Sequence, residues 1–144
     1  MQTDYNIKGM RILVEKNKEY KVKIIDNGYE GEGIAKIDDF TIFIKGAIKG
    51  EICKIVITKV NKTFAFGRLL EVIKASENRV EPDCATYKRC GGCSLRHIKY
   101  EETLKIKRDM VQNLVNKTLK NKITVNGVIG MKSPYNYRNK LQYP

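Results

Sequence analysis

Apolar and polar residues alternate along much of the stretch between residues 19 and 73, which is the pattern of half-buried β-strands. Glycine and asparagine interrupt the alternation at short intervals, where chain reversals are expected. Short strands separated by such turns favour a small barrel that is closed or nearly closed, because closure removes exposed sheet edges. The expected strands cover residues 20–24, 31–37, 40–44, 53–60 and 64–72.

The pattern changes after residue 75. Residues 76–82 read as a polar linker, and we expect the cysteine-containing segment that follows to be a loop held by a metal rather than by apolar contacts. From Glu101 to about Leu119, apolar residues recur every three or four positions, which predicts an amphipathic helix. Extended segments are expected at residues 123–129 and 135–143.

These patterns predict a mainly β fold followed by an α+β part. We expect a β-barrel at residues 12–75, a metal-binding loop at 76–98 and the start of a further α/β domain at 99–144. The chain stops at Pro144 within an extended pattern and before any closing element. We therefore expect it to be the front part of a longer protein.

Three of the four cysteines are clustered. Cys84, Cys90 and Cys93 stand in the spacing C-x5-C-x2-C, and two glycines fill the shorter gap. The glycines allow the backbone to turn tightly enough for Cys90 and Cys93 to face one metal centre. Thiolates select iron–sulfur clusters or zinc. An iron–sulfur cluster normally takes four ligands, so this set is one ligand short.

A zinc site could take its fourth ligand from within the chain. His97 follows Cys93 after three intervening residues and would complete a Cys3His set, although this spacing is not a common zinc-finger spacing. His97 also directly precedes the expected helix, where it could pack or cap instead. The remaining cysteine, Cys53, shares strand parity with Ile55 and Ile57, so we expect it in the barrel core.

The chain is strongly basic, with a formal net charge of +12 and a pI near 9.6. This suggests a polyanionic partner, foremost nucleic acid, although solvated lysine side chains are the alternative. No stretch approaches the roughly 20 apolar residues of a membrane span, and the start of the chain lacks the apolar core of a signal peptide. We expect a cytoplasmic monomer with reduced thiols and no membrane association.

One expected strand carries a candidate nucleic-acid surface. Phe64, Phe66 and Arg68 alternate along it and therefore face one side. Such a stripe can stack bases and hold a backbone, but it can equally fill a barrel core with the arginine at the rim. Further basic residues that could contact phosphate groups are Lys59, Lys62, Arg138 and Lys140.

Motifs of catalysis are missing. The sequence has no G-x-G-x-x-G or Walker loop, and its single histidine cannot build a Ser/His/Asp triad. We predict no catalytic residue in this chain.

Several segments together resemble the RumA/TrmA-type family of S-adenosylmethionine-dependent RNA (uracil-5-)-methyltransferases. The likeness is to the branch that carries an N-terminal TRAM domain and a 4Fe–4S cluster and modifies 23S ribosomal RNA. The cysteine block from Cys84 to His97 is its most specific part. The other matching segments are residues 31–35, 49–51 and 65–71 for TRAM, 100–107 for the following helix, and 134–142 for the start of the central domain.

The resemblance implies that residues 12–75 form an OB-like TRAM barrel that binds RNA. It implies that Cys84, Cys90 and Cys93 ligate the cluster together with a fourth cysteine of the central domain, downstream of Pro144. The catalytic cysteine, the base and the S-adenosylmethionine site would lie in a C-terminal Rossmann-like domain outside this chain. The chain alone is therefore expected to bind RNA without methylating it.

Other readings remain at this point. A stand-alone TRAM module with a Cys3His zinc site would bind RNA without catalysis, and metal identity separates it from the first reading. A radical-type iron–sulfur enzyme is disfavoured, because such enzymes use C-x3-C-x2-C and the first gap here is five residues. The modified RNA could also be transfer RNA. A cluster would have a structural role, since the methylation needs no electron.

Overall fold

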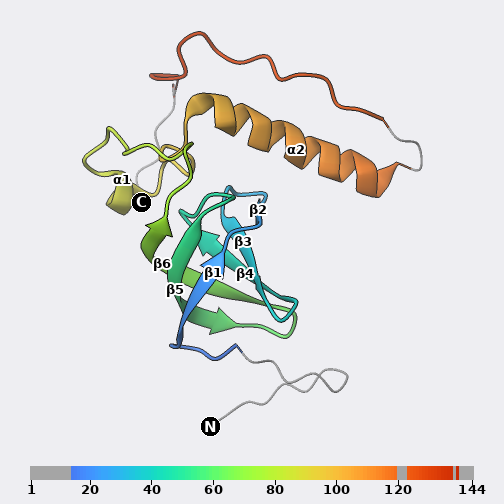
Figure 1. Cartoon of the computed structure of the whole chain (residues 1–144). Helices are drawn as coiled ribbons and strands as arrows, with labels where there is room; N and C mark the ends of the chain where they lie inside the picture. Colours follow the sequence, from blue (N-terminus) through green and yellow to red (C-terminus); the bar gives the residue numbers. More distant parts are fainter. Residues whose placement is uncertain (1–13, 120–122, 138, 140–144) are drawn as a thin grey trace. The chain divides into compact units, whose positions relative to one another are not determined.

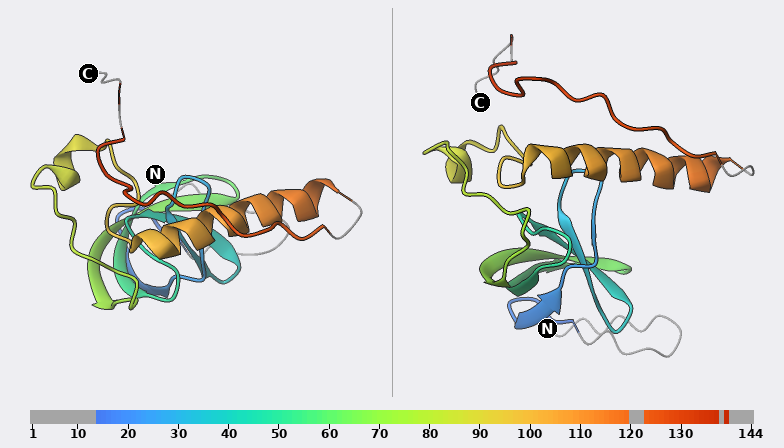
Figure 2. Two further views of the ribbon diagram at one scale, coloured as in Figure 1. Left: turned by 90° about the horizontal axis from the view of Figure 1, so that it is seen from above. Right: turned by 45° about the horizontal axis from the view of Figure 1, so that its top comes forward.

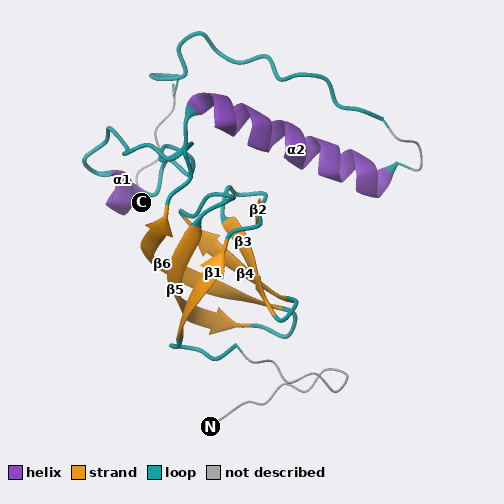
Figure 3. Ribbon diagram, in the orientation of Figure 1, coloured by secondary structure: helices purple, strands orange, loops and turns teal. Residues whose placement is uncertain are grey.

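The computed structural model describes residues 14–119, 123–137 and 139 (Figure 1). It divides into two compact units, of which the first ends at Lys99 and the second begins at Tyr100. The first unit holds the β-strands and a short helix, and the second is built on one long helix (Figure 3). In these described ranges, no helix is both long and apolar enough to cross a membrane.

The strands of the first unit form a single sheet in the order β1-β5-β6-β4-β3-β2. Every neighbouring pair is antiparallel except β4 and β6, which run parallel. The mainly β fold predicted from the alternation is thereby confirmed. The strand bounds are Glu19–Lys23 for β1, Asp26–Asn27 for β2, Gly33–Ile37 for β3, Phe40–Lys45 for β4, Ile52–Val60 for β5 and Phe64–Lys74 for β6.

The sheet closes because its two outermost strands, β1 and β2, are consecutive parts of one bent segment. Just after β1, the backbone N–H of Ile24 donates to the carbonyl of Glu51 beside β5, at 2.9 Å. The next residue, Ile25, donates to the carbonyl of Ile34 on β3, at 2.8 Å. The same segment thus bonds to both sides of the sheet, which leaves the barrel without two long free edges.

The barrel core consists of alternate residues from each strand, as a period of two requires. Gly67 on β6 makes room for it: a Cβ atom there would lie 3.0 Å from the side chain of Ile55. Cys53 is fully buried, and burial raises the pKa of its thiol to about 11, so it stays neutral. The side chains that fill the core include Val22, Ile24, Ile42, Ile44, Ile55 and Ile57.

The segment that contains the clustered cysteines is closed at its base by the protein itself. The backbone N–H of Val80 donates to the carbonyl of His97 at 3.0 Å, and that of Lys99 donates to the carbonyl of Asn78 at 2.9 Å. Ile98 beside this pairing is only 4% exposed. The expectation that only a metal holds this loop is therefore incomplete, because its two ends are paired by backbone hydrogen bonds.

A buried ion pair ties the same segment to the barrel. The carboxylate of Glu51 is fully buried and accepts hydrogen bonds from Arg79 through Nε at 2.6 Å and Nη2 at 2.7 Å. Backbone N–H groups of Ile48 and Ser76 donate to the same carboxylate. Burial alone would raise the pKa of Glu51, but these hydrogen bonds outweigh it and hold the pKa below its ordinary value.

The second unit contains helix α2, Tyr100–Thr118, with an extended segment running along it in the opposite direction (Figures 1 and 2). The helix matches its predicted bounds to within one residue. Its buried residues are Thr103 and Ile106, whereas Val111 and Leu114 of the predicted apolar face are exposed.

Within the described part of residues 123–137, the predicted strands do not form. A strand needs a neighbouring strand to take its backbone hydrogen bonds, and here the side chain of Gln112 takes two of them instead. The side-chain N–H of Gln112 donates to the carbonyl of Ile123, and its side-chain oxygen accepts from the N–H of Val125, both at 2.8 Å. The N–H of Met131 donates to the hydroxyl of Tyr100.

Candidate nucleic-acid interface and metal centre

The predicted stripe of Phe64, Phe66 and Arg68 lies on the outer face of the barrel. The residues between them, Ala65 and Gly67, point into the core and are buried. Phe66 is 43% exposed. The alternative in which these rings fill the barrel interior therefore does not apply, and the stripe is available to a partner.

A third ring completes this surface. Phe43 on β4 stands opposite Phe66 in the parallel pairing with β6, and its ring centroid lies 5.6 Å from that of Phe64 and 6.1 Å from that of Phe66. The rings of Phe64 and Phe66 are 5.4 Å apart and perpendicular. We call Phe43, Phe64 and Phe66 the aromatic cluster.

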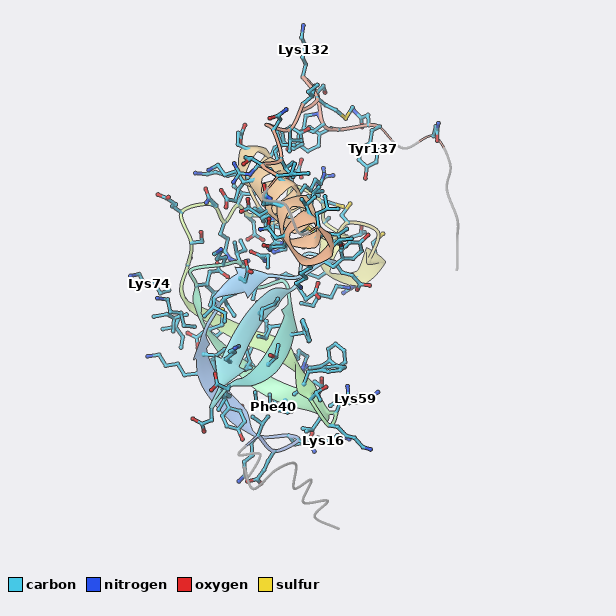
Figure 4. The ribbon with its side chains drawn as sticks, turned by 90° about the vertical axis from the view of Figure 1, so that its right-hand side faces the viewer. Lys16, Phe40, Lys59, Lys74, Lys132 and Tyr137 are labelled. Carbon is cyan, nitrogen blue, oxygen red and sulfur yellow. The ribbon has the colours of Figure 1, made fainter. Side chains whose placement is uncertain are left out.

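Basic side chains flank the aromatic cluster. Lys59 on β5 stands opposite Phe66, and Lys45 stands opposite Arg68 in the next row of the sheet. Lys62 lies in the turn between β5 and β6. Figure 4 shows Lys59 projecting from the barrel. Within the described part of the chain, none of these four cations has an acidic partner, whereas Lys18, Lys36, Lys49 and Lys54 each pair with a carboxylate.

Sequence reasoning missed Phe43 and Lys45, although a signal for them exists. Phe43-x-Lys45 has the same aromatic and basic spacing as Phe66-x-Arg68. The parallel pairing of β4 with β6 places these two stretches side by side. The sequence near either strand does not predict that pairing. Two other predicted contacts, Arg138 and Lys140, lie outside the described residues.

The clustered cysteines lie around the short helix α1, Tyr87–Cys90, which ends at Gly91 with a left-handed backbone (φ 67°). Cys84 is half-buried, and Cys90 and Cys93 are exposed. In the ranges that the structure describes, no three His, Cys, Asp or Glu side chains are gathered so that they could hold a metal ion. The three thiols thus share one short segment, but in the described structure they are not gathered into a ligand set of three.

The chemistry of this donor set nevertheless fits a metal that binds thiolates. The Thr86 side chain, with its oxygen 3.3 Å from Cys84 Sγ, and the Thr86 backbone lower the pKa of the Cys84 thiol, and the Arg96 charge adds to this. Arg96 itself donates to Asp83 at 2.6 Å and also interacts with Cys93. A lower thiol pKa favours the thiolate form, which is the form that ligates zinc and iron.

His97 is placed differently from the cysteines. The residue is 3% exposed, and its Nδ1 lies 2.6 Å from the hydroxyl of Tyr87. Nε2 has no hydrogen-bond partner among the described residues. Burial, together with the nearby charge of Arg79, lowers the pKa of His97 to about 4, so the ring is neutral at pH 7. A set of ligands that combines His97 with the exposed cysteines is not present in the described part of the chain.

The buried neutral ring of His97 predicts a loss of stability in acid. The pKa is about 4 in the folded chain against 6.5 for a free histidine, so the unfolded chain binds one more proton between these pH values. Unfolding free energy should therefore decrease as the pH falls from 6.5 towards 4, by up to about 1.4 kcal/mol per pH unit. Urea denaturation at pH 7 and pH 5 measures this. In His97→Gln the decrease should be smaller, and an equal decrease would contradict the assignment.

Comparison with known proteins gives the class of this fold. Residues 13–70 match the family described as the TRAM domain. An uncharacterized RNA methyltransferase of Clostridium acetobutylicum is 48% identical over 136 residues, which is 92% of this chain and 30% of that protein. One of Halalkalibacterium halodurans is 42% identical over 132 residues, covering 91% of this chain and 29% of that protein. A solved structure, a conserved protein of Methanococcus maripaludis, aligns with 46% of this chain and 100% of its own at 37% identity, with a TM-score of 0.40.

The barrel and the family match define the core of the first unit as a TRAM domain. The TRAM match and the similarity to proteins named RNA methyltransferase agree with the TRAM and RNA methyltransferase parts of the resemblance found in the sequence. The chain is consistent with the TRAM-bearing N-terminal part of a RumA/TrmA-type protein. It spans about 30% of the length of these relatives.

Proposed function

We propose that this chain is the RNA-binding N-terminal part of an S-adenosylmethionine-dependent RNA (uracil-5-)-methyltransferase that acts on 23S ribosomal RNA. The observation that carries the proposal is a TRAM barrel whose outer face presents aromatic rings beside cations that have no acidic partner among the described residues. Rings stack on bases and cations neutralise phosphates. The similar proteins are named RNA methyltransferases, which supports the wider activity.

The first test is RNA binding by the 144-residue chain. Fluorescence anisotropy with a labelled RNA should give a logarithmic affinity that falls linearly with the logarithm of salt concentration. The control is polyphosphate, a polyanion without bases. At the same length and charge as the RNA, it should bind more weakly. Absence of salt-dependent RNA binding would contradict the proposal.

Methylation is expected only from the longer protein. Outside the segment of Cys84, Cys90 and Cys93, the one described cysteine is Cys53. Its thiol is buried and has a raised pKa, so it is not a candidate nucleophile. The catalytic residues and the S-adenosylmethionine site belong to the part beyond this chain. Transfer of a radioactive methyl group to 23S ribosomal RNA should be seen with a protein of the relatives' full length. The 144-residue chain should bind the same RNA and transfer none.

A 4Fe–4S cluster is part of the proposal, with Cys84, Cys90 and Cys93 as its ligands in this chain and a fourth ligand outside it. A bound cluster would pin the exposed cysteine segment, whose two ends the backbone pairing of Asn78–Val80 with His97–Lys99 already holds. Cysteine ligands require reduced thiols, which agrees with the cytoplasmic location that we include in the proposal.

Metal content separates the iron–sulfur proposal from the zinc alternative. A protein of the relatives' full length, purified without oxygen, should contain iron and matching acid-labile sulfide, and Cys90→Ser should lower both strongly. His97→Gln is the matched control, because it removes the fourth ligand of the zinc set but no ligand of the cluster. Stoichiometric zinc that is lost in His97→Gln would contradict the iron–sulfur assignment and favour a Cys3His module.

A further inference from the structure

We propose that the aromatic cluster of Phe43, Phe64 and Phe66 is a stacking platform for an unpaired base of single-stranded RNA. The inference rests on the RNA-binding function proposed above. It adds the face of the barrel that binds, a contributing strand that local sequence reasoning missed, and the form of RNA that this face accepts.

The geometry of the three rings is that of a prepared binding surface. The ring of Phe66 is contacted by Phe64 at a centroid distance of 5.4 Å and by Phe43 at 6.1 Å, so neighbours restrain it from two strands. It remains 43% exposed in spite of these contacts. A ring that is already held in place loses little conformational freedom when a base stacks on it, which favours binding.

The charges around the cluster favour a nucleotide over an apolar protein segment. Lys59 lies opposite Phe66, and Lys45 and Arg68 lie in the adjacent row. Desolvating these cations under an apolar partner would be unfavourable, since no described carboxylate pairs with them. Two acidic side chains at the margins of this sheet are paired with other lysines: Asp26 with Lys49 and Asp39 with Lys36.

A nucleotide supplies both complementary groups at once, a planar base for the cluster and a phosphate for the cations. In a duplex, however, each base face is covered by its neighbours, so a duplex could contact only the cations. An unpaired base has a face free to stack on Phe66. The combination therefore points to single-stranded RNA.

A fluorescent ring at the centre of the cluster tests the stacking directly. The chain contains no Trp, so Phe66→Trp introduces a single tryptophan. A single-stranded RNA of about ten nucleotides should quench its emission, and a duplex of the same sequence should quench it far less. Ile73→Trp is the matched control, because Ile73 lies on the same strand and is 46% exposed but stands seven positions from Phe66, well beyond Arg68. Its emission should change little with either RNA.

Affinity gives the second measurement. Phe66→Ala should weaken binding of the single-stranded RNA by between about fivefold and 150-fold, which is the range for loss of one stacked base, and should leave duplex binding unchanged. Ile73→Ala should leave both unchanged. If the wild-type chain binds RNA but prefers the duplex, or Phe66→Trp is not quenched, the platform is refuted while RNA binding stands. If the wild-type chain binds no RNA, both proposals fail. Should Phe66→Ala not fold, the Phe66→Trp measurement decides.

Discussion

Replacing Arg79 with Met is expected to lower the free energy of unfolding of the first unit by about 3–5 kcal/mol. The substitution removes both hydrogen bonds to Glu51, whose carboxylate is fully buried, and leaves it without a countercharge. Arg79 also donates to the carbonyl of Gly46, so a barrel loop loses a partner as well. The side chain of Arg79 is 24% exposed, so water can replace part of what is lost, and the lower end of the range is the expectation. Urea denaturation followed by circular dichroism measures the change.

Two further variants distinguish the stability cost of breaking the buried Glu51–Arg79 pair from the cost of removing any surface charge. Lys54→Met breaks an exposed ion pair with Glu19, which water and salt screen, and should therefore cost far less stability than Arg79→Met. The double variant Glu51→Gln with Arg79→Met should recover part of the loss, because no unpaired charge then remains buried. Equal effects of Arg79→Met and Lys54→Met would show that the Glu51–Arg79 pair contributes no more than a surface pair.

The pH dependence of this pair has a defined sign. The pKa of Glu51 is below the ordinary 4.5, so the unfolded chain takes up a proton on this group more readily than the folded chain. Its contribution to stability is therefore complete above pH 4.5 and is lost as the pH falls through the lower, folded-state pKa. In Glu51→Gln this part of the acid loss should disappear.

Replacing Lys59, Lys62 and Arg68 together with Ala is expected to weaken RNA binding about a hundredfold at about 0.1 M salt. If each cation neutralises one phosphate of a single strand, each loss reduces the slope of log affinity against log salt concentration by about 0.7. At about 0.1 M salt this corresponds to about a fivefold loss of affinity per residue. None of the three has an acidic partner among the residues that the structure describes, so their removal should hardly affect stability.

A charge-matched variant is the control for this experiment. Replacing Lys21, Lys23 and Lys74 with Ala removes the same net charge from exposed positions of the same barrel, away from the aromatic cluster. Figure 4 shows Lys74 well separated from Lys59. An equal loss of affinity and of salt slope in both variants would mean that general charge, not this face, attracts RNA. An unchanged slope in the first variant would place the RNA surface elsewhere.

The strands and the core follow from the order of residues along the chain. A period of two defines which side chains share a face of a strand, so the burial of Cys53, Ile55 and Ile57 was predictable from parity alone. The same rule placed Phe64, Phe66 and Arg68 on one side. It did not say which side, because aromatic residues suit a core as well as an exposed binding surface.

Long-range pairing lies beyond such local rules. The parallel contact of β4 with β6 brings Phe43 to Phe66, which are separated by the whole of β5 along the chain. Glu51 and Arg79 are 28 positions apart, and from the sequence alone each would be expected to lie at the surface. Residues 123–137 had the pattern of strands but form none in the described part, since a strand also requires a partner.

The residue order of this protein thus specifies its strands, its long helix and its cysteine spacing, because these depend on neighbours a few positions away. The composition of the aromatic cluster, the buried ion pair and the burial of His97 depend on which distant segments meet when the barrel closes. Those contacts form between residues that are far apart in the chain and are brought together only by folding, so the sequence around each residue does not determine them.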